Sequence, residues 1–84
     1  MKSDEITIRR GIQVNTDIAS FSAYNAALLP DGSIEVYLTF TTDQDHEFTL
    51  HLGDTFPVRD QTWRLDRVED AGKPNWHIAL RRVK

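Results

Sequence analysis

The fold is decided by the segment LPDGSIEVYLTFT, residues 29–41, in which a turn leads directly into a strand. Pro30 presets the backbone angle that a turn needs, and Gly32 accepts the positive φ of a bulged hairpin loop. After the turn every second residue is apolar, which is the period of a strand with one buried face. The apolar set is Ile34, Val36, Leu38 and Phe40. This segment therefore predicts two antiparallel strands joined by a hairpin.

The same alternation recurs along the chain, separated by turn residues roughly every ten positions, as in all-β domains. Residues 18–29 mix alanines that tolerate a helix with aromatics that favour a strand, and the hairpin turn behind them favours a strand. Pro57 cannot donate to a ladder, which places its strand at a sheet edge. We expect strands over residues 6–14 with a β-bulge at Gly11, 18–29, 33–41, 47–52, 55–58, 62–69 and 76–83. The sequence thus predicts one all-β domain over residues 1–84, a small antiparallel barrel or sandwich of six to seven short strands.

The last two predicted strands form a hairpin that gathers the largest apolar side chains. We expect Leu65 to face Leu80 and Arg67 to face Ile78 across this hairpin. One face then carries Trp63, Leu65, Trp76, Ile78 and Leu80. That face should belong to the core, because two tryptophans supply more apolar area than any other side chains in so small a domain.

The opposite face of this hairpin is the leading candidate site. The expected register puts Arg64 across from Arg81 and Asp66 across from Ala79, with His77 nearby. Two arginines astride one carboxylate have the chemistry to recognise an anion or a partner's acidic side chain. The alternative is a solvated sheet face, whose exposed ion pairs are each worth ~0–1 kcal/mol.

Tyr37 is the fifth candidate binding residue, because it lies on the polar face of the strand over residues 33–41. Exposed tyrosine is enriched at binding surfaces, although strand propensity alone also accounts for a single one. A nucleic-acid platform would need exposed aromatics beside basic residues, and the only candidates for exposed aromatics are Tyr37 and Tyr24. The basic pairs Arg9-Arg10 and Arg81-Arg82, with Lys84, would form one patch if the first and last strands were neighbours.

The amino-acid composition excludes or disfavours several classes of protein. The 84 residues include no cysteine, which excludes a disulfide framework and a thiolate metal site. A formal charge of −3 disfavours a protein that binds duplex DNA. Residues 1–42 and 43–84 carry similar net charges, so no charged tail stands out. The charged start of the chain and the absence of a long apolar run predict a cytoplasmic protein with no membrane role.

Metal-binding and catalytic patterns are weak. His46 and His51 are an odd number of residues apart and so project from opposite faces of a strand, which argues against a zinc site. The acidic turn Asp43, Asp45 and Glu47 lacks the central glycine and distal glutamate of a calcium loop. The serines Ser20, Ser22 and Ser33 have no histidine at a recognisable spacing and no nucleophile elbow. We therefore expect no metal, no cofactor and no catalytic residue.

Five stretches carry a resemblance to a known family: Arg9 to Val14, Pro30 to Gly32, Gly53 to Val58, Thr62 to Val68 and Trp76 to Val83. Together they resemble a family of small actinobacterial all-β proteins of unknown function. The resemblance covers nearly the whole chain and implies an actinobacterial source. It implies no activity, and no functional residue is carried over.

The functional expectation rests on what the sequence lacks. Small barrels fill their interiors with side chains, and the usual catalytic residue patterns are missing. We expect a non-enzymatic module that binds another protein, or a second copy of itself, through a sheet face or a strand edge. The alternative is a small-molecule or anion-binding domain that uses the polar face of the last hairpin.

Overall fold

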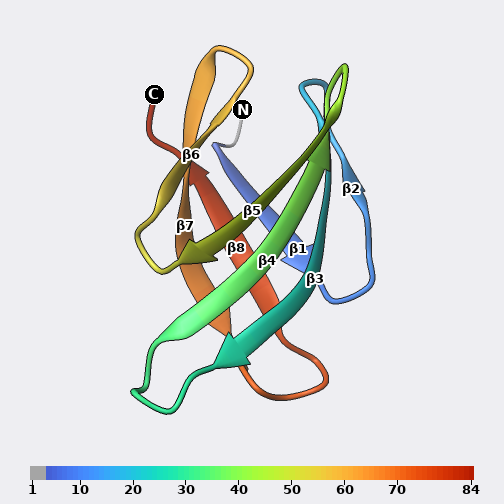
Figure 1. Ribbon diagram of the computed structural model, residues 1–84. Coiled ribbons are helices and arrows are strands. Elements are labelled where there is room, and N and C mark those ends of the chain that lie inside the picture. The colour runs from blue at the N-terminus through green and yellow to red at the C-terminus, as the bar shows by residue number, and fades with distance from the viewer. Residues whose placement is uncertain (1–3) are drawn as a thin grey trace.

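The computed structural model describes residues 4–84, and these form a sandwich of two antiparallel four-stranded sheets (Figure 1). Sheet 1 has the strand order β1-β8-β7-β6, and sheet 2 has the order β2-β3-β4-β5. Their bounds are β1 Glu5–Arg9, β2 Val14–Asn15, β3 Ser20–Leu28, β4 Ile34–Thr41, β5 Asp45–His51, β6 Thr55–Val58, β7 Gln61–Glu69 and β8 His77–Arg82. The predicted all-β class is confirmed. The sheets do not close into a barrel, and the described residues contain eight strands where six to seven were expected.

The chain crosses between the sheets twice, from β1 to β2 and from β5 to β6. The single strand expected over residues 6–14 is therefore wrong, because its two ends lie in different sheets. Gly11 has a φ of +74° and lies within the turn from Arg9 to Ile12. The Ile12 amide donates to the Arg9 carbonyl at 3.1 Å and closes this turn. Gly11 thus belongs to the turn at this corner of the sandwich rather than to a β-bulge.

The hairpin that decides the fold forms as expected. β3 and β4 pair from Leu28↔Ile34 to Ser20↔Thr41, which confirms that residues 18–29 are mostly strand. Gly32 adopts a φ of +89° in the connecting turn. The register shifts within β3, where Tyr24 has no ladder partner and forms a bulge. Beyond the bulge the buried residues continue with the alternation displaced by one position.

The core lies between the two sheets and is almost wholly aliphatic and aromatic. Phe21 on β3 is fully buried, with its ring centroid 5.6 Å from Phe40 and 6.5 Å from Trp63. Because Trp63 belongs to sheet 1, this cluster joins the two layers. All five residues expected on the core face of the last hairpin are buried, namely Trp63, Leu65, Trp76, Ile78 and Leu80.

The last hairpin follows the predicted register through Leu65↔Leu80 and then departs from it. Asp66 is an extra residue in β7, so Arg67 faces Ala79 and Val68 faces Ile78. The expectations that Arg67 faces Ile78 and that Asp66 faces Ala79 are therefore wrong. A bulge leaves one residue unpaired and displaces every later pair by one. No helix in residues 4–84 is long and apolar enough to cross a membrane.

The start of β1 and the end of β8 lie at the same end of the sandwich (Figure 1). The amide of Arg82 on β8 donates to the carbonyl of Asp4 at 2.8 Å, which extends the pairing of the first and last strands. β1 and β8 are antiparallel, with Glu5 opposite Arg81 and Arg9 opposite His77.

Candidate functional site

The outer face of sheet 1 holds four of the five candidate residues, and we call it the arginine face. Arg64 and Arg81 lie directly opposite each other across β7 and β8, as the sequence predicted. His77 lies four residues from Arg81 on β8, a separation of ~13 Å along a strand, and it faces Glu69. The arginine face comprises Glu5, Arg9, Arg64, Asp66, Arg67, Glu69, His77 and Arg81.

Asp66 is flanked by two arginines, but the second is Arg67 rather than Arg81. The Nη2 atom of Arg64 donates to Asp66 Oδ1 at 3.1 Å, and the Nη1 atom of Arg67 lies 3.3 Å from Asp66 Oδ2. The same Arg67 atom lies 3.3 Å from Glu5 Oε2 on β1. Arg67 therefore reaches across β8 and links three strands, while within residues 4–84 no carboxylate lies within ion-pair distance of Arg81.

The expected basic patch of the first and last strands does not form on this face. The two strands are neighbours, as the hypothesis required, but they run antiparallel. Arg9 consequently lies opposite His77, and Arg81 lies opposite Glu5 at the other end of the ladder.

The histidines and serines do not assemble into a reactive cluster. His46 points inward and stacks on Phe40 with a centroid separation of 4.8 Å, whereas His51 is exposed. The hydroxyl of Ser33 donates to Asp31 at 2.6 Å. Over residues 4–84 there is no group of three or more histidine and carboxylate side chains placed to hold a metal ion.

The outer face of sheet 2 has a different character, and we call it the tyrosine face. Tyr24 on the β3 bulge is 70% exposed and Tyr37 on β4 is 38% exposed, so both rings are accessible to a partner. Strand alternation from buried Phe21 and Ala23 points Tyr24 outward, and the bulge points Asn25 outward as well, so that Ala26 returns to the core. The face comprises Ser20, Ser22, Tyr24, Asn25, Ala27, Glu35, Tyr37, Thr39, Thr41, Asp45, Glu47, Thr49 and His51.

Two adjoining hollows mark the centre of the tyrosine face. One has a volume of about 350 Å³ and the other about 160 Å³. Tyr24, Thr39 and Glu47 line both hollows, so they form one continuous depression across β3, β4 and β5. Tyr37 lines the larger hollow.

A hydrogen-bonded group fixes Tyr37. Its hydroxyl donates to Glu35 Oε1 at 2.7 Å, and the Nε2 atom of His51 lies 3.3 Å from Glu35 Oε2. The hydrogen bond to Glu35, together with the negative charge of that carboxylate, raises the pKa of Tyr37 above its ordinary value. The hydrogen bond to Glu35 thereby holds the phenol in a defined orientation.

The two faces differ sharply in charge. Residues 11–58, which include all of sheet 2, contain seven acidic residues and no lysine or arginine. The rest of the chain contains all ten basic residues against six acidic ones, a formal net charge of +4. Dividing the chain into equal halves hides this separation, because each half mixes strands of both sheets. A search for lysine-free and arginine-free stretches would have found it.

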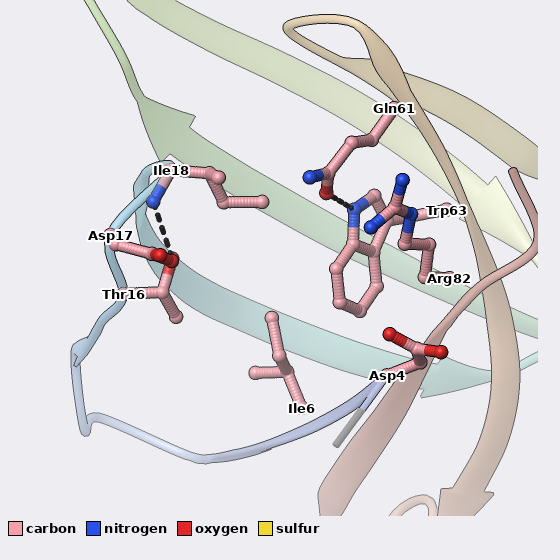
Figure 2. A pocket seen from close by; sticks show the side chains of 8 residues that line it. All are labelled: Asp4, Ile6, Thr16, Asp17, Ile18, Gln61, Trp63 and Arg82. Carbon is pink, nitrogen blue, oxygen red and sulfur yellow. Dashed lines mark hydrogen bonds between the residues drawn. The ribbon is translucent and has the colours of Figure 1, made fainter. Parts of the chain in front are cut away.

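A third feature is a pocket of about 110 Å³ between the two sheets, which we call the inter-sheet pocket. Figure 2 shows the turn before β3 on one side of it and the start of β7 with the end of β8 on the other. Its floor is apolar and its rim is charged. The lining residues are Asp4, Ile6, Thr16, Asp17, Ile18, Gln61, Trp63 and Arg82.

Comparison with known families gives one match. Residues 3–84 fit the model described as "Family of unknown function (DUF6406)". The chain belongs to this family. The predicted resemblance to a family of unknown function is thus confirmed, and membership covers nearly the whole chain. No curated protein and no solved structure matches the chain significantly.

Membership in the DUF6406 family assigns no chemistry to any residue. The residues that matter must therefore be argued from their surroundings in this structure. The sequence identified Tyr37 and the arginine face, but it placed no weight on Tyr24, Glu47 or the inter-sheet pocket. Tyr24 and Glu47 are brought to one depression by the pairing of β3, β4 and β5, and the pocket depends on the packing of one sheet against the other.

Proposed function

We propose that this chain is a non-enzymatic protein-interaction module that binds a basic segment of another protein through its tyrosine face. The observation that carries the proposal is the pair of exposed tyrosines, Tyr24 and Tyr37, on a face that contains no lysine or arginine. A cytoplasmic location and an actinobacterial source stay predictions from the sequence.

The chemistry of the face favours a cationic occupant. Glu47 lines both hollows, and within the described residues its carboxylate has no ion-pair partner. A lysine or arginine seated in the depression would neutralise Glu47 and stack on a tyrosine ring, which adds a cation–π attraction. Tyrosine also contributes a large contact area for little loss of side-chain entropy, so it is common at interface hot spots.

The charges favour a different protein, rather than a second copy of this chain, as the partner of the tyrosine face. The arginine face is the basic surface that a second copy would offer, but its arginines are partly satisfied already. Arg64 and Arg67 are engaged by Asp66 and Glu5 within the sheet. Breaking those pairs would offset part of what a new interface contributes.

The test is a titration of the protein with a short arginine-glycine repeat peptide, monitored by ¹⁵N-¹H NMR. We expect chemical-shift changes to centre on Tyr24, Tyr37 and Glu47, and the matched glutamate-glycine peptide to cause none. Binding should weaken as salt rises, because exposed charges are screened beyond ~8 Å at physiological ionic strength. The double variant Tyr24→Thr/Tyr37→Thr should bind at least ~10-fold more weakly, since hot-spot truncation costs more than ~1 kcal/mol.

The matched control is Ile12→Thr, which removes an exposed apolar side chain outside the tyrosine face and should leave binding unchanged. Threonine keeps the strand propensity at all three positions. Equal binding by the acidic peptide, or an unchanged affinity in the double variant, would overturn the proposal. Salt-sensitive self-association without peptide binding would instead assign the face to a second copy of the chain.

The alternative function is recognition of an inorganic or organic anion by the arginine face. It is favoured by the direct pairing of Arg64 with Arg81, whose guanidinium has no carboxylate partner among residues 4–84. Inorganic phosphate at a hundred times its dissociation constant should then add ~2.7 kcal/mol to the free energy of unfolding. The Arg64→Ala/Arg81→Ala variant should lose this gain, and the absence of any thermal shift in the wild type would remove this alternative.

A further inference from the structure

The inter-sheet pocket combines an apolar floor with charges of both signs at its rim. Ile6, Ile18 and Trp63 form the floor, and they come from β1, the turn before β3, and β7. Asp17 stands on one side of the rim and Arg82 on the other (Figure 2). The pocket lies at the end of the sandwich where β1 begins and β8 ends, away from the hollows of the tyrosine face.

The charged groups of the rim are available for a ligand. Within residues 4–84, neither Asp4 nor Asp17 nor Arg82 has an ion-pair partner. The Nε atom of Arg82 donates to the Lys84 carbonyl at 3.0 Å, which fixes the side chain while leaving both Nη atoms to donate elsewhere. A carboxylate is the anion that this planar fork of donors fits best.

The walls of the pocket are held in place before any ligand arrives. The hydroxyl oxygen of Thr16 accepts from the amides of Ile18 and Ala19, each at 3.2 Å, which closes the turn that carries Asp17. The carbonyl of Ile18 accepts from Arg59 Nε at 2.7 Å. Binding to a preformed site avoids the entropy cost of ordering a loop.

The floor is fixed as well. The indole Nε1 of Trp63 donates to Gln61 Oε1 at 2.9 Å, and this bond sets the orientation of the ring (Figure 2). The volume of about 110 Å³ is smaller than an engineered cavity of ~150 Å³ that accommodates benzene. The apolar part of a ligand is thereby limited to a side chain about the size of leucine or valine.

We propose that the inter-sheet pocket binds a zwitterion of amino-acid size with a short aliphatic side chain. The ligand carboxylate lies against Arg82, its ammonium group lies against the carboxylate of Asp17 on the opposite side of the rim, and its aliphatic part covers Trp63. This proposal is independent of the tyrosine face, because the two sites share no lining residue.

The experiment is an NMR titration that follows the indole Nε1–H signal of Trp63, with that of buried Trp76 as the internal reference. Leucine is the probe, and 3-methylbutylamine and 4-methylpentanoate are matched ligands that each lack one of its charges. We expect leucine to move the Trp63 signal saturably, to leave the Trp76 signal unchanged, and to bind at least tenfold more tightly than either single-charge ligand.

Two surface variants test the charges separately. Asp17→Asn and Arg82→Gln should each weaken leucine binding several-fold or more, and both positions are exposed, so the fold should persist. Glu69→Gln and Arg9→Gln remove the same charges elsewhere and should leave the affinity unchanged. The proposal is overturned if leucine leaves the Trp63 signal unmoved up to its solubility limit. Equal binding of the amine, or unchanged affinity in Arg82→Gln, would also overturn it.

Discussion

Asp31 shows how one side chain secures the turn on which the fold depends. Its Oδ1 atom accepts from the Ser33 hydroxyl at 2.6 Å and from the Ser33 amide at 2.9 Å. Aspartate is common in turns because its short side chain can bond to the backbone two residues further on. The charge on Asp31 therefore matters to the hairpin, although the residue is fully accessible.

These hydrogen bonds predict a pH dependence. The Ser33 hydroxyl, followed by the Ser33 amide, lowers the pKa of Asp31 below its ordinary value of 3.8. A lowered pKa in the folded state gives stability that is present above pH 3.8 and is lost as the pH falls through the folded pKa. We expect a ¹³C NMR titration of the carboxyl to show this low pKa and Ser33→Ala to raise it toward 3.8. A Ser33→Ala variant with an unchanged pKa would contradict the assignment.

Tyr37 gives a pH dependence of stability opposite in sign to that of Asp31. Hydrogen bonding to Glu35 raises the pKa of the phenol above 10.0, so its contribution to stability is complete below pH 10.0 and is lost as the pH rises through the folded pKa. In a Tyr24→Phe background Tyr37 is the single tyrosine, and its ionisation can be followed by ultraviolet absorbance. We expect Glu35→Gln to lower this pKa toward 10.0. An unchanged absorbance titration would show that Glu35 does not hold the hydroxyl.

At the scale of the strand, two single-residue bulges shape both candidate faces. Tyr24 in β3 and Asp66 in β7 are each left without a ladder partner. The first bulge adds Asn25 beside Tyr24 on the outer face of sheet 2, and the second changes the arginine partners of Asp66. Bulges are frequent near functional sites because they re-aim a side chain without breaking the sheet.

The packing of β3 against sheet 1 predicts a large loss of stability on truncation. Phe21 is fully buried and touches the rings of both Phe40 and Trp63. Phe21→Ala should cost ~3–5 kcal/mol, against ~4–12 kcal/mol expected for the whole of an 84-residue chain. Urea denaturation measures the loss, and Phe21→Leu should lose much less. A cost below ~1 kcal/mol for Phe21→Ala would mean that the sheets do not depend on this contact.

At the scale of the whole molecule, the charges are sorted by sheet. The segment that forms sheet 2 contains no lysine or arginine, and all lysines and arginines belong to residues 1–10 and 59–84, which contribute β1, β7 and β8 of sheet 1. Because the sheets pack through their apolar faces, their outer faces point in opposite directions and carry different charges. The molecule can therefore present two chemically distinct surfaces despite its size.

The strand order predicts a pattern of amide hydrogen exchange. β3, β4, β7 and β8 each have neighbours on both sides, whereas β1, β2, β5 and β6 are edges. Exchange is slowest where opening requires the loss of most of the core. We expect the slowest amides in the four central strands, and faster exchange from the outward-facing amides of β5. Protection of β1 equal to that of β8 would contradict this arrangement or reveal a partner on the edge of β1.

The sequence by itself determined the all-β class, the β3–β4 hairpin, the core face of the last hairpin and the family. The first three depend on period-two alternation and turn residues, which are local properties, and the family depends on the match of particular residues over nearly the whole chain. Only the tertiary structure decided that residues 6–14 turn a corner at Gly11 and that Arg67 rather than Arg81 flanks Asp66. It also decided that Asp17 and Arg82 meet at one pocket. A bulge or a corner moves one residue between faces at little local cost, so packing between the sheets, rather than the local pattern, selects the outcome.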